Sequence, residues 1–404
     1  MHLLMIHQSF VGPDEAGGTR HYEFARKMVQ QGHEVTIVAS DLSYLTGGKT
    51  VHGEGVVTEQ WIDGIRVLRA YTYPSFHKSF AWRVVSFLSF MVTSVIAAAR
   101  AGSVDVVMGT SPPIFQAVSA WFVAFLKRRP FLLEIRDLWP EFAVDLGVLK
   151  NPVLISAARW IEVFLYARAR RIVVNSPAYR DYLLRKRVPA KKVHLIPNGV
   201  DPEMFDPDAD GAGFREELGM NGKFVVTYAG ALGMANDIPT ILGAAKFLRD
   251  DDRIRILLVG DGKERWRLEA MAKDLSLDNV TFAGARPKRI MPQVLAASDA
   301  CVATLRDIPM FRTTYPNKVF DYMAAGRPTI LAIDGVIREV VEAAGGGVFV
   351  PPGDPKGLAE AIRRLADSPR AAKEMGARAR EYVCRHFNRA AHAAAFVRTV
   401  ERLR

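Results

Sequence analysis

The sequence predicts an α/β protein made of two units of similar size, each built on a parallel sheet covered on both faces. Short runs rich in Val, Ile and Leu alternate with helical patterns along the chain. These runs are continuously apolar, which is typical of strands buried on both faces. At roughly 100–200 residues per domain, 404 residues suggest two or three domains, of which the alternation pattern favours two.

The elements of the first half come in a regular order. Apolar runs predict strands at residues 3–7, 34–39, 65–70, 105–109, 131–135 and 171–175. Helical patterns predict helices at residues 19–31, 81–101, 114–127, 152–169 and 177–185. Strands separated by helices in this way indicate βαβ units and a parallel sheet.

The alternation pauses at residues 196–202 (IPNGVDP), where Pro, Asn and Gly mark a turn. Residues 206–213 (DPDADGAG) then indicate an exposed linker. The second half predicts strands at 224–229, 254–259, 280–283, 300–303, 329–332 and 347–350. Its predicted helices cover 237–248, 264–275, 287–297, 316–325, 337–344 and 355–367. Ligands bind beyond the carboxyl ends of such strands, so a cleft between the two units is the expected site.

The composition is that of a globular chain, with 49% hydrophobic and 24% charged residues. It excludes a disordered protein, a collagen-like repeat and a disulfide scaffold. Cys301 and Cys384 are expected to be free thiols in a reducing compartment. The net charge of +11 is uneven: residues 1–200 carry +9 and the remainder +2. A basic first half suits an anionic partner, although a solvated basic surface would have the same composition.

Two apolar stretches raise the question of a membrane. Residues 84–99 and 106–126 are uncharged, but the first is short for a spanning helix and Pro112–Pro113 interrupts the second. Two buried elements of a globular domain are the favoured interpretation. The alternative is that one apolar face enters a membrane surface, since the basic cluster at 127–129 directly follows and would attract anionic lipid. The amino terminus lacks the pattern of a signal peptide.

The first candidate site is the loop after the opening strand. It runs from His7 to Gly17, Gly18, Thr19 and Arg20 just before a helix. Glycines let backbone N–H groups approach a ligand, and a helix N-terminus favours an anion. The signal is weak alone, because a Gly pair before a helix is often only a turn.

The second candidate site follows the strand at 131–135. Arg136, Asp137 and Glu141 lie at the end of the strand where sites form. Asp137 and Glu141 could act as a base or as hydroxyl ligands. The structural alternative is that Asp137 caps a helix and Arg136 forms an ordinary ion pair.

The third candidate site precedes and opens a helix. Pro316 fits a first-turn position, which places Lys318 in the first helical turn. A cation is unfavourable there unless an anion is bound. Asp321 is expected on the same face, so the pair could hold a diphosphate and a sugar hydroxyl.

Other patterns carry less. The acidic run at 250–252 precedes a strand, so it lies at the wrong edge of the sheet for a metal site and indicates a solvated turn. Gly260, Asp261 and Gly262 follow a strand and could approach a ligand, but they also form an ordinary turn. The histidines show no metal-ligand spacing.

Short motifs stand in order along nearly the whole chain. They are HQSF at 7–10, GGTRHYEFARKMVQQGHEVTIVAS at 17–40, TSPP at 110–113, RDLWPE at 136–141, NSP at 175–177, IPNGVD at 196–201, YAGALG at 228–233, LLVGDG at 257–262 and YPNKVFDYMAAGRP at 315–328. This combination resembles a retaining glycosyltransferase of the family-4 type. It is similar to the bacterial subgroup that includes L-fucosamine transferases of O-antigen and capsule synthesis.

The resemblance implies a GT-B fold, with two Rossmann-like domains facing a cleft. It implies an acceptor-binding domain at 1–200, a nucleotide-sugar domain at 201–385, and a last helix, about 386–404, that crosses back to the first domain. No metal is expected, because positive side chains and a helix N-terminus neutralise the diphosphate. Expected donor contacts are Gly17, Gly18, Gly230, Asp261, Gly262, Arg286, Thr314, Tyr315, Pro316 and Asn317. Expected acceptor contacts are His7, Thr19, Arg20, Arg136 and Glu141.

The chain also departs from the family pattern. The usual first glutamate of a spaced pair is Thr313, while Asp321 keeps an acid at the second. Two basic positions of the phosphate clamp are Ala231 and Asn236, and the usual first-domain histidine near Thr110 is absent. Lys318 is therefore expected to carry the diphosphate, with Arg20 or Arg286 in support.

The resulting hypothesis is a cytoplasmic enzyme on the inner face of a bacterial plasma membrane. It transfers a sugar, an N-acetylated hexosamine or deoxyhexosamine, from a UDP donor to a polyprenyl-diphosphate-linked acceptor. The catalytic residues are Asp137, Lys318 and Asp321. One alternative is a nucleotide-sugar epimerase of the same architecture, and a remote one is a basic nucleic-acid-binding module, for which no recognition motif is present.

Overall fold

The computed structural model describes residues 1–15, 17–43, 47–51, 55–74 and 80–404. The chain divides into two compact units. The first unit comprises Met1–Gly12, Thr19–Pro197 and Ala390–Arg404, and the second comprises Pro13–Gly18 and Asn198–Arg389. The last fifteen residues thus return to the first unit, as the fold expectation for the final helix required.

The first unit contains one eight-stranded sheet in the order β3-β4-β2-β1-β5-β6-β7-β8. All pairs are parallel except β3 with β4. Its strands are β1 (His2–Ile6), β2 (Glu34–Ser40), β3 (Val57–Ile62), β4 (Ile65–Ala70), β5 (Val106–Ser111), β6 (Phe131–Ile135), β7 (Arg171–Val174) and β8 (Val193–Leu195). Its helices are α1 (Arg20–Gln30), α2 (Phe80–Ala99), α3 (Ile114–Lys127), α4 (Glu141–Asp145), α5 (Pro152–Arg168), α6 (Pro177–Arg185) and α15 (Arg389–Glu401).

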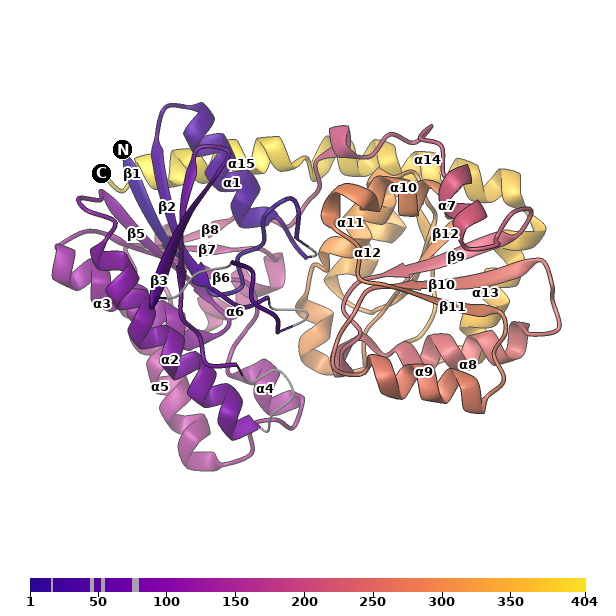
Figure 1. Cartoon of the computed structure of the whole chain (residues 1–404), viewed down its shortest axis with the longest axis horizontal. Helices are drawn as coiled ribbons and strands as arrows, with labels where there is room; N and C mark the ends of the chain where they lie inside the picture. Colours follow the sequence, from indigo (N-terminus) through magenta and orange to yellow (C-terminus); the bar gives the residue numbers. More distant parts are fainter. Residues whose placement is uncertain (16, 44–46, 52–54, 75–79) are drawn as a thin grey trace. The chain divides into compact units, whose positions relative to one another are not determined.

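Helices cover both faces of this sheet, which explains its continuously apolar strands. On one side α1 and α15 pack together, with the rings of Phe24 and Phe396 stacked 4.7 Å apart. On the other side lie α2, α3 and α5 (Figure 1). Alternate residues of each strand face the two layers. Leu3 and Met5, for example, belong to the core shared with α1 and α15.

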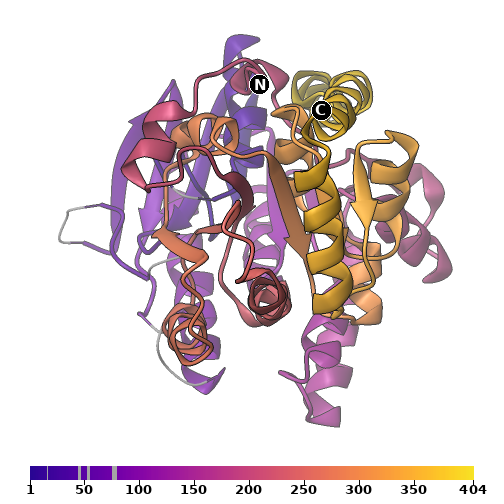
Figure 2. The same cartoon turned by 90° about the vertical axis from the view of Figure 1, so that its right-hand side faces the viewer.

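The second unit contains a six-stranded, entirely parallel sheet in the order β11-β10-β9-β12-β13-β14. Its strands are β9 (Phe224–Ala229), β10 (Ile254–Val259), β11 (Val280–Gly284), β12 (Ala300–Thr304), β13 (Thr329–Ala332) and β14 (Gly347–Phe349). Its helices are α7 (Ala212–Glu217), α8 (Ile238–Leu248), α9 (Arg265–Asp274), α10 (Met291–Ala296), α11 (Asn317–Ala324), α12 (Val336–Ala343), α13 (Pro355–Asp367) and α14 (Pro369–His386). Figure 2 looks onto this unit.

The second sheet is also enclosed on both sides. One core holds side chains of α8, α9 and α13, and the other holds side chains of α10, α11, α12 and α14. Each βα step therefore delivers a loop to the carboxyl edge of the sheet, where the predicted donor residues lie.

The structure corrects several sequence expectations. It adds β3, which pairs antiparallel with β4, and the short edge strand β8. Only one of its six residues is buried and three are polar, so β3 has no continuous apolar run by which the sequence could predict it. Helices α4, α7 and α14 were also not expected. The predicted helix at 287–297 divides into a 3₁₀ turn, Lys288–Ile290, followed by α10.

Candidate functional site

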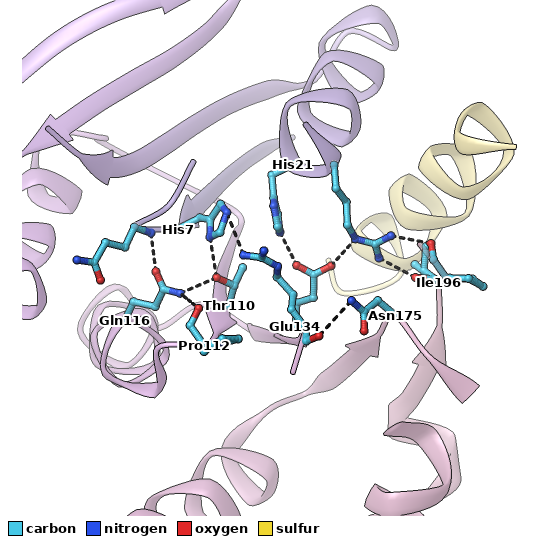
Figure 3. A network of polar contacts seen from close by, with 12 residues as sticks. His7, His21, Thr110, Pro112, Gln116, Glu134, Asn175 and Ile196 are labelled. Carbon is cyan, nitrogen blue, oxygen red and sulfur yellow. Dashed lines mark hydrogen bonds and ion pairs between the residues drawn. The ribbon is translucent and has the colours of Figure 1, made fainter. Parts of the chain in front are cut away.

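A network of buried polar side chains lies where the strands of the first sheet end (Figure 3). His7 directly follows β1, Thr110 lies near the end of β5, and Glu134 lies near the end of β6. Parallel strands end at one edge of a sheet, so residues far apart in sequence meet there. All three side chains are almost fully buried, which requires each polar group to find a partner.

His7 holds Arg136 in place. Its Nδ1 lies 2.9 Å from Thr110 Oγ1, and Arg136 donates from Nη1 to His7 Nε2 over 3.3 Å. Because a guanidinium cannot accept a hydrogen bond, Nε2 is the acceptor and Nδ1 carries the proton. Burial, reinforced by the charges of His21 and Arg136, holds the pKa of His7 well below its usual range. His7 is therefore a neutral side chain that orients Arg136.

Glu134 is a buried carboxylate neutralised on both sides. Arg20 donates from Nε to its Oε1 over 3.0 Å, and His21 Nε2 lies 2.5 Å from Oε2. Burial alone would raise the pKa of Glu134, but the charges of His21 and Arg20 outweigh it and lower the pKa. Arg20 also donates to the carbonyl oxygens of Ile196 and Pro197, both over 2.7 Å. Arg20 thus binds residues 196–197, where the chain leaves the first unit. The Arg20 residue is only 3% exposed, which leaves little surface for the predicted acceptor contact.

Asp137 follows β6 and is half-buried. Pro140, not Asp137, is the N-cap residue of α4, which removes the helix-cap alternative. Burial raises the pKa of Asp137 to about 6, against the opposing effects of Arg136 and of a hydrogen bond that Tyr179 donates over 3.3 Å. A carboxyl group with this pKa can take up a proton near neutral pH, as a general base must.

Two other predicted acceptor residues have structural partners. Both oxygens of Glu141 accept from Arg159 of α5, each over 2.9 Å, in a bidentate ion pair. Thr19 is the N-cap residue of α1 but makes no capping hydrogen bond with its side chain. Its hydroxyl donates to Glu23 over 2.5 Å instead.

Sequence reasoning missed several members of this network. Gln116 of α3 donates to Thr110 Oγ1 and to the carbonyl of Pro112, each over 2.8 Å. Asn175 donates to the carbonyl of Arg136 over 3.2 Å. The usable signal was Glu134, because a charge inside the apolar run FLLEI requires partners from neighbouring strands.

In the second unit, glycines line the carboxyl edge of the sheet. Gly230 follows β9 with φ 159°, and Gly260 follows β10 with φ 152°. A Cβ atom on Gly260 would lie 1.8 Å from the Gly230 carbonyl oxygen, so only glycine fits there. Asp261 accepts from the backbone N–H of Gly262 over 2.7 Å and pairs with Arg265 at 3.2 Å. The close packing of these loops therefore requires glycine at these positions whether or not a ligand binds there.

Lys318 is the clearest candidate for binding an anion. It stands in the first turn of α11, as predicted, and its Nζ donates to Tyr228 Oη over 2.6 Å and to Asn236 Oδ1 over 3.0 Å. Nζ also lies 4.1 Å from the centre of the Tyr228 ring. Among the described residues, no carboxylate lies within 4.0 Å of this ammonium group. Burial lowers the pKa of Lys318 to about 7, and no neighbouring acid restores it.

Asp321 has a partner that the sequence did not suggest. Its Oδ2 accepts from Lys288 Nζ over 2.6 Å, in an ion pair that is largely buried. Asn317, the first residue of α11, has a buried Oδ1 without a hydrogen-bond partner. The start of α11 therefore presents an uncompensated cation and an unsatisfied acceptor, and Lys288, from the segment after β11, reaches the same helix through Asp321.

The remaining predicted donor residues are placed as follows. Arg286 donates to Glu217 over 3.1 Å at the surface, and Pro316 is the N-cap residue of α11 rather than its first residue. The hydroxyl of Thr314 donates to the carbonyl of Phe311 over 2.8 Å. Burial raises the pKa of Tyr315 to about 12, since its ring packs in the core. Gly17 (φ 143°) and Gly18 lie in the loop before α1, and that loop includes residue 16, outside the described residues.

Within the described ranges of the chain, no group of three or more His, Cys, Asp or Glu side chains could hold a metal ion. Metal independence stays a prediction.

Two family descriptions match the chain. "Glycosyl transferase 4-like domain" matches residues 16–199, and "Glycosyl transferases group 1" matches residues 223–368. The chain is a glycosyltransferase of the family-4 type. The first match covers most of the sequence of the first unit and the second lies within the second unit. This glycosyltransferase therefore has one recognised domain for each sheet.

Curated relatives agree with the family. The glycosyltransferase is 25% identical over 278 residues to WbjE of Pseudomonas aeruginosa, named a glycosyltransferase, covering 68% of this chain and 69% of that protein. It is 24% identical over 328 residues to WcaI of Escherichia coli, named a colanic acid biosynthesis glycosyl transferase, covering 77% and 78%. These matches to transferases do not favour the epimerase alternative.

Solved structures agree with the GT-B fold. Sucrose-phosphate synthase of Thermosynechococcus elongatus superposes with a TM-score of 0.78 at 22% identity, over 100% of this chain and 98% of that chain. HepE of Anabaena in complex with UDP-glucose gives a TM-score of 0.74 at 19% identity, over 99% of both chains. The fold expectation of two α/β domains with parallel sheets is thereby confirmed.

Proposed function

We propose that this glycosyltransferase moves a sugar, with retention and without a metal, from a UDP-linked donor to a polyprenyl-diphosphate-linked acceptor. The sugar is an N-acetylated hexosamine or deoxyhexosamine, as in the fucosamine-transferase subgroup that the motifs resemble. The name of WcaI supports a role in surface polysaccharide synthesis, and the UDP-glucose bound to HepE supports a UDP donor.

The observation that carries the proposal is Lys318. A buried ammonium group whose partners are neutral is costly unless an anion neutralises it. A leaving diphosphate supplies that anion, and its negative charge grows as the glycosidic bond breaks. A positioned cation therefore stabilises the transition state more than the ground state. The unsatisfied Oδ1 of Asn317 is a suitable acceptor for a donor hydroxyl.

On the acceptor side, Asp137 receives the hydroxyl proton or orients the hydroxyl for same-face attack. Its pKa near 6 leaves it ionised at neutral pH. Arg136, held by His7, is the nearby cation that suits a phosphorylated acceptor.

Nucleotide release tests the reaction. The protein is first screened by thermal shift against UDP, GDP and CDP, since a bound ligand stabilises by mass action. UDP-sugars are then incubated with and without a polyprenyl-diphosphate-linked sugar. We expect acceptor-dependent UDP release and a lengthened lipid product. An epimer formed from the donor alone would instead establish the epimerase, and stabilisation by GDP but not UDP would overturn the UDP assignment.

We also propose that the enzyme is peripheral on the inner face of the bacterial plasma membrane. The support is an apolar surface on α2, α3 and α5, where α3 packs against both neighbours. The exposed large apolar side chains on these three helices are Trp82, Val85, Leu88, Val92, Ile96, Phe122, Phe125, Leu126, Val153, Leu154, Trp160 and Val163. So many exposed large apolar side chains on three neighbouring helices are unusual on a soluble monomer and support an interaction surface here.

The same surface carries positive charge. Arg83 lies on α2, Arg128 and Arg129 follow α3, and Arg168 ends α5. Basic side chains beside apolar ones attract anionic lipid. By length and composition, Trp82–Ala99 alone among the described helices could cross a membrane, with one third of it buried in the protein. Its packing on the sheet through Phe90 and Ala97 suits a helix that lies against lipid.

Vesicle flotation tests this surface. We expect the protein to float with phosphatidylglycerol vesicles and much less with phosphatidylcholine. Trp160→Glu should strongly reduce flotation, whereas Trp266→Glu is the matched control, because the two side chains are 67% and 72% exposed in different units. Equal flotation of the two variants would contradict the proposed surface.

A further inference from the structure

The first unit contains a second basic feature, away from the polar network. A cavity of about 420 Å³ lies between α6, the edge strand β8 and the final helix α15. Its lining includes Arg180, His194, Arg398 and Arg402. None of the residues that line this cavity is acidic.

The arginines of this cavity are not neutralised by the protein. No ion pair or side-chain hydrogen bond joins Arg180, Arg398 or Arg402 to another described residue. Arg398 lies on α15 and Arg402 directly follows the helix, with its backbone N–H bonded to the Arg398 carbonyl, so the two are one turn apart, a spacing at which like charges repel. The neighbouring acids do not relieve this: Glu401 pairs with His33 at 3.2 Å, and Asp181 is exposed on α6. Arg398 and Arg402 are exposed, so the packing of α15 in the core does not require a cation at either position.

His194 lies within the same positive field. Arg171 of β7 donates from Nη1 to its Nε2 over 3.1 Å, so this nitrogen is an acceptor and the ring is neutral. Burial lowers the pKa of His194, and the charges of Arg171 and Arg402 lower it further. Arg171 and the charged side chains that line the cavity with His194 are thus all cationic.

We propose that this cavity binds a phosphate-bearing anion, at a site distinct from the donor diphosphate site around Lys318. A guanidinium matches phosphate in a bidentate geometry. The three arginines together carry more positive charge than a single carboxylate could neutralise, which favours a ligand with several negative charges. A phosphate monoester carries −1.5 to −2 at neutral pH, and a diphosphate carries more. The cavity volume admits such a group together with part of its ester. The phosphate can come from a soluble molecule or from a lipid headgroup.

His194 provides a reporter inside the cavity. Inorganic pyrophosphate is titrated into the full-length protein, with the histidine rings observed by NMR and the His194 signal assigned with His194→Gln. We expect the signal to shift and the pKa of His194 to rise, because bound negative charge offsets Arg171 and Arg402. Arg398→Gln/Arg402→Gln should weaken binding at least about tenfold, whereas Arg364→Gln, an exposed arginine of α13, should not.

Two further arms identify the source and the site. The same titration in Lys318→Ala must keep the His194 shift, which separates this cavity from the proposed donor site. For a lipid source, flotation with phosphatidylglycerol vesicles is measured in the Trp160→Glu background, with and without the two arginine substitutions. Pyrophosphate binding that depends on the arginines supports a soluble phosphate, and arginine-dependent flotation alone supports a lipid headgroup. The proposal is overturned if neither occurs, if the double variant binds like wild type, or if the shift disappears with Lys318→Ala.

Discussion

Two buried charges stand at equivalent places in the two units, and their surroundings differ. Glu134, at the carboxyl edge of the first sheet, is flanked by Arg20 and His21. Lys318, at the carboxyl edge of the second, has only the hydroxyl of Tyr228 and the amide of Asn236. A buried charge that the protein itself neutralises has a structural role. A charge left with neutral partners indicates that its counterion arrives with a ligand.

The largest effect should come from breaking the compensated charge. Glu134→Gln leaves the Arg20 guanidinium buried without a carboxylate, and we expect the first unit to lose about 3–5 kcal/mol of stability. Tryptophan fluorescence during urea unfolding measures this, because every tryptophan except Trp266 lies in the first unit. Glu141→Gln breaks a more exposed pair in the same unit and should cost at most about 1 kcal/mol. Equal losses of stability in the two variants would contradict the inference that the buried pair of Glu134 and Arg20 matters more than an exposed ion pair.

The next effect concerns the uncompensated charge. Lys318→Ala should lower the rate of sugar transfer about 10²–10³-fold, the usual cost of removing one preorganised group that stabilises transition-state charge. Urea unfolding should show no loss, because this variant removes a buried cation that nothing neutralises. Lys246→Ala, an exposed lysine of α8, is the control. A loss in rate below about tenfold would count against the role of Lys318.

Donor affinity should also depend on pH. Free Lys318, with a pKa of about 7, loses its proton as the pH rises, and an anion must restore that proton to bind well. The affinity for UDP should therefore fall about tenfold per pH unit above pH 7. Calorimetric titration between pH 6.5 and 8.5 checks this. Lys318→Arg keeps its charge throughout and should flatten the profile, whereas an unchanged slope would place the titrating group elsewhere.

The smallest effect concerns Asp137. The hydrogen bond from Tyr179 lowers the pKa of this carboxyl group, so Tyr179→Phe should raise it above 6. A base acts when deprotonated, so the acid limb of the pH–rate profile should move upward by up to about one unit. The transfer rate at pH 6 should then fall by less than tenfold, with little change at pH 8. Tyr182→Phe, on the same helix, should leave the limb in place, and equal shifts would contradict the assignment.

The sequence was sufficient for the features that depend on local patterning. Apolar runs identified the central strands of both sheets. A strand covered by helices on both faces is apolar at every position, so it stands out in the sequence as a continuous run. The position of Lys318 in the first turn of α11 followed from Pro316 and from Gly326, which has φ 66° just beyond the helix end.

Features that depend on distant partners could not be predicted. Asp321 of α11 pairs with Lys288, which follows β11, and Arg20 binds carbonyl groups at Ile196 and Pro197, far along the chain. Strand β3 had one usable signal, the Asp63–Gly64 pair with φ 48° and 79°, which suits a tight hairpin. Its partly exposed, partly polar side chains give β3 no apolar run, which is the pattern that identifies the central strands.

The return of Ala390–Arg404 to the first unit has a consequence for synthesis. Phe396, Val397, Val400 and Leu403 complete the core around β1 and α1. These residues follow the second unit in the chain, so the first unit cannot complete its core until residues 198–389 have also been synthesised. Until then the core of the first unit lacks the side chains of α15. The second unit, whose residues 198–389 are already present, can fold first. The second unit can therefore complete its fold before the first unit does, although most of the first unit is translated earlier.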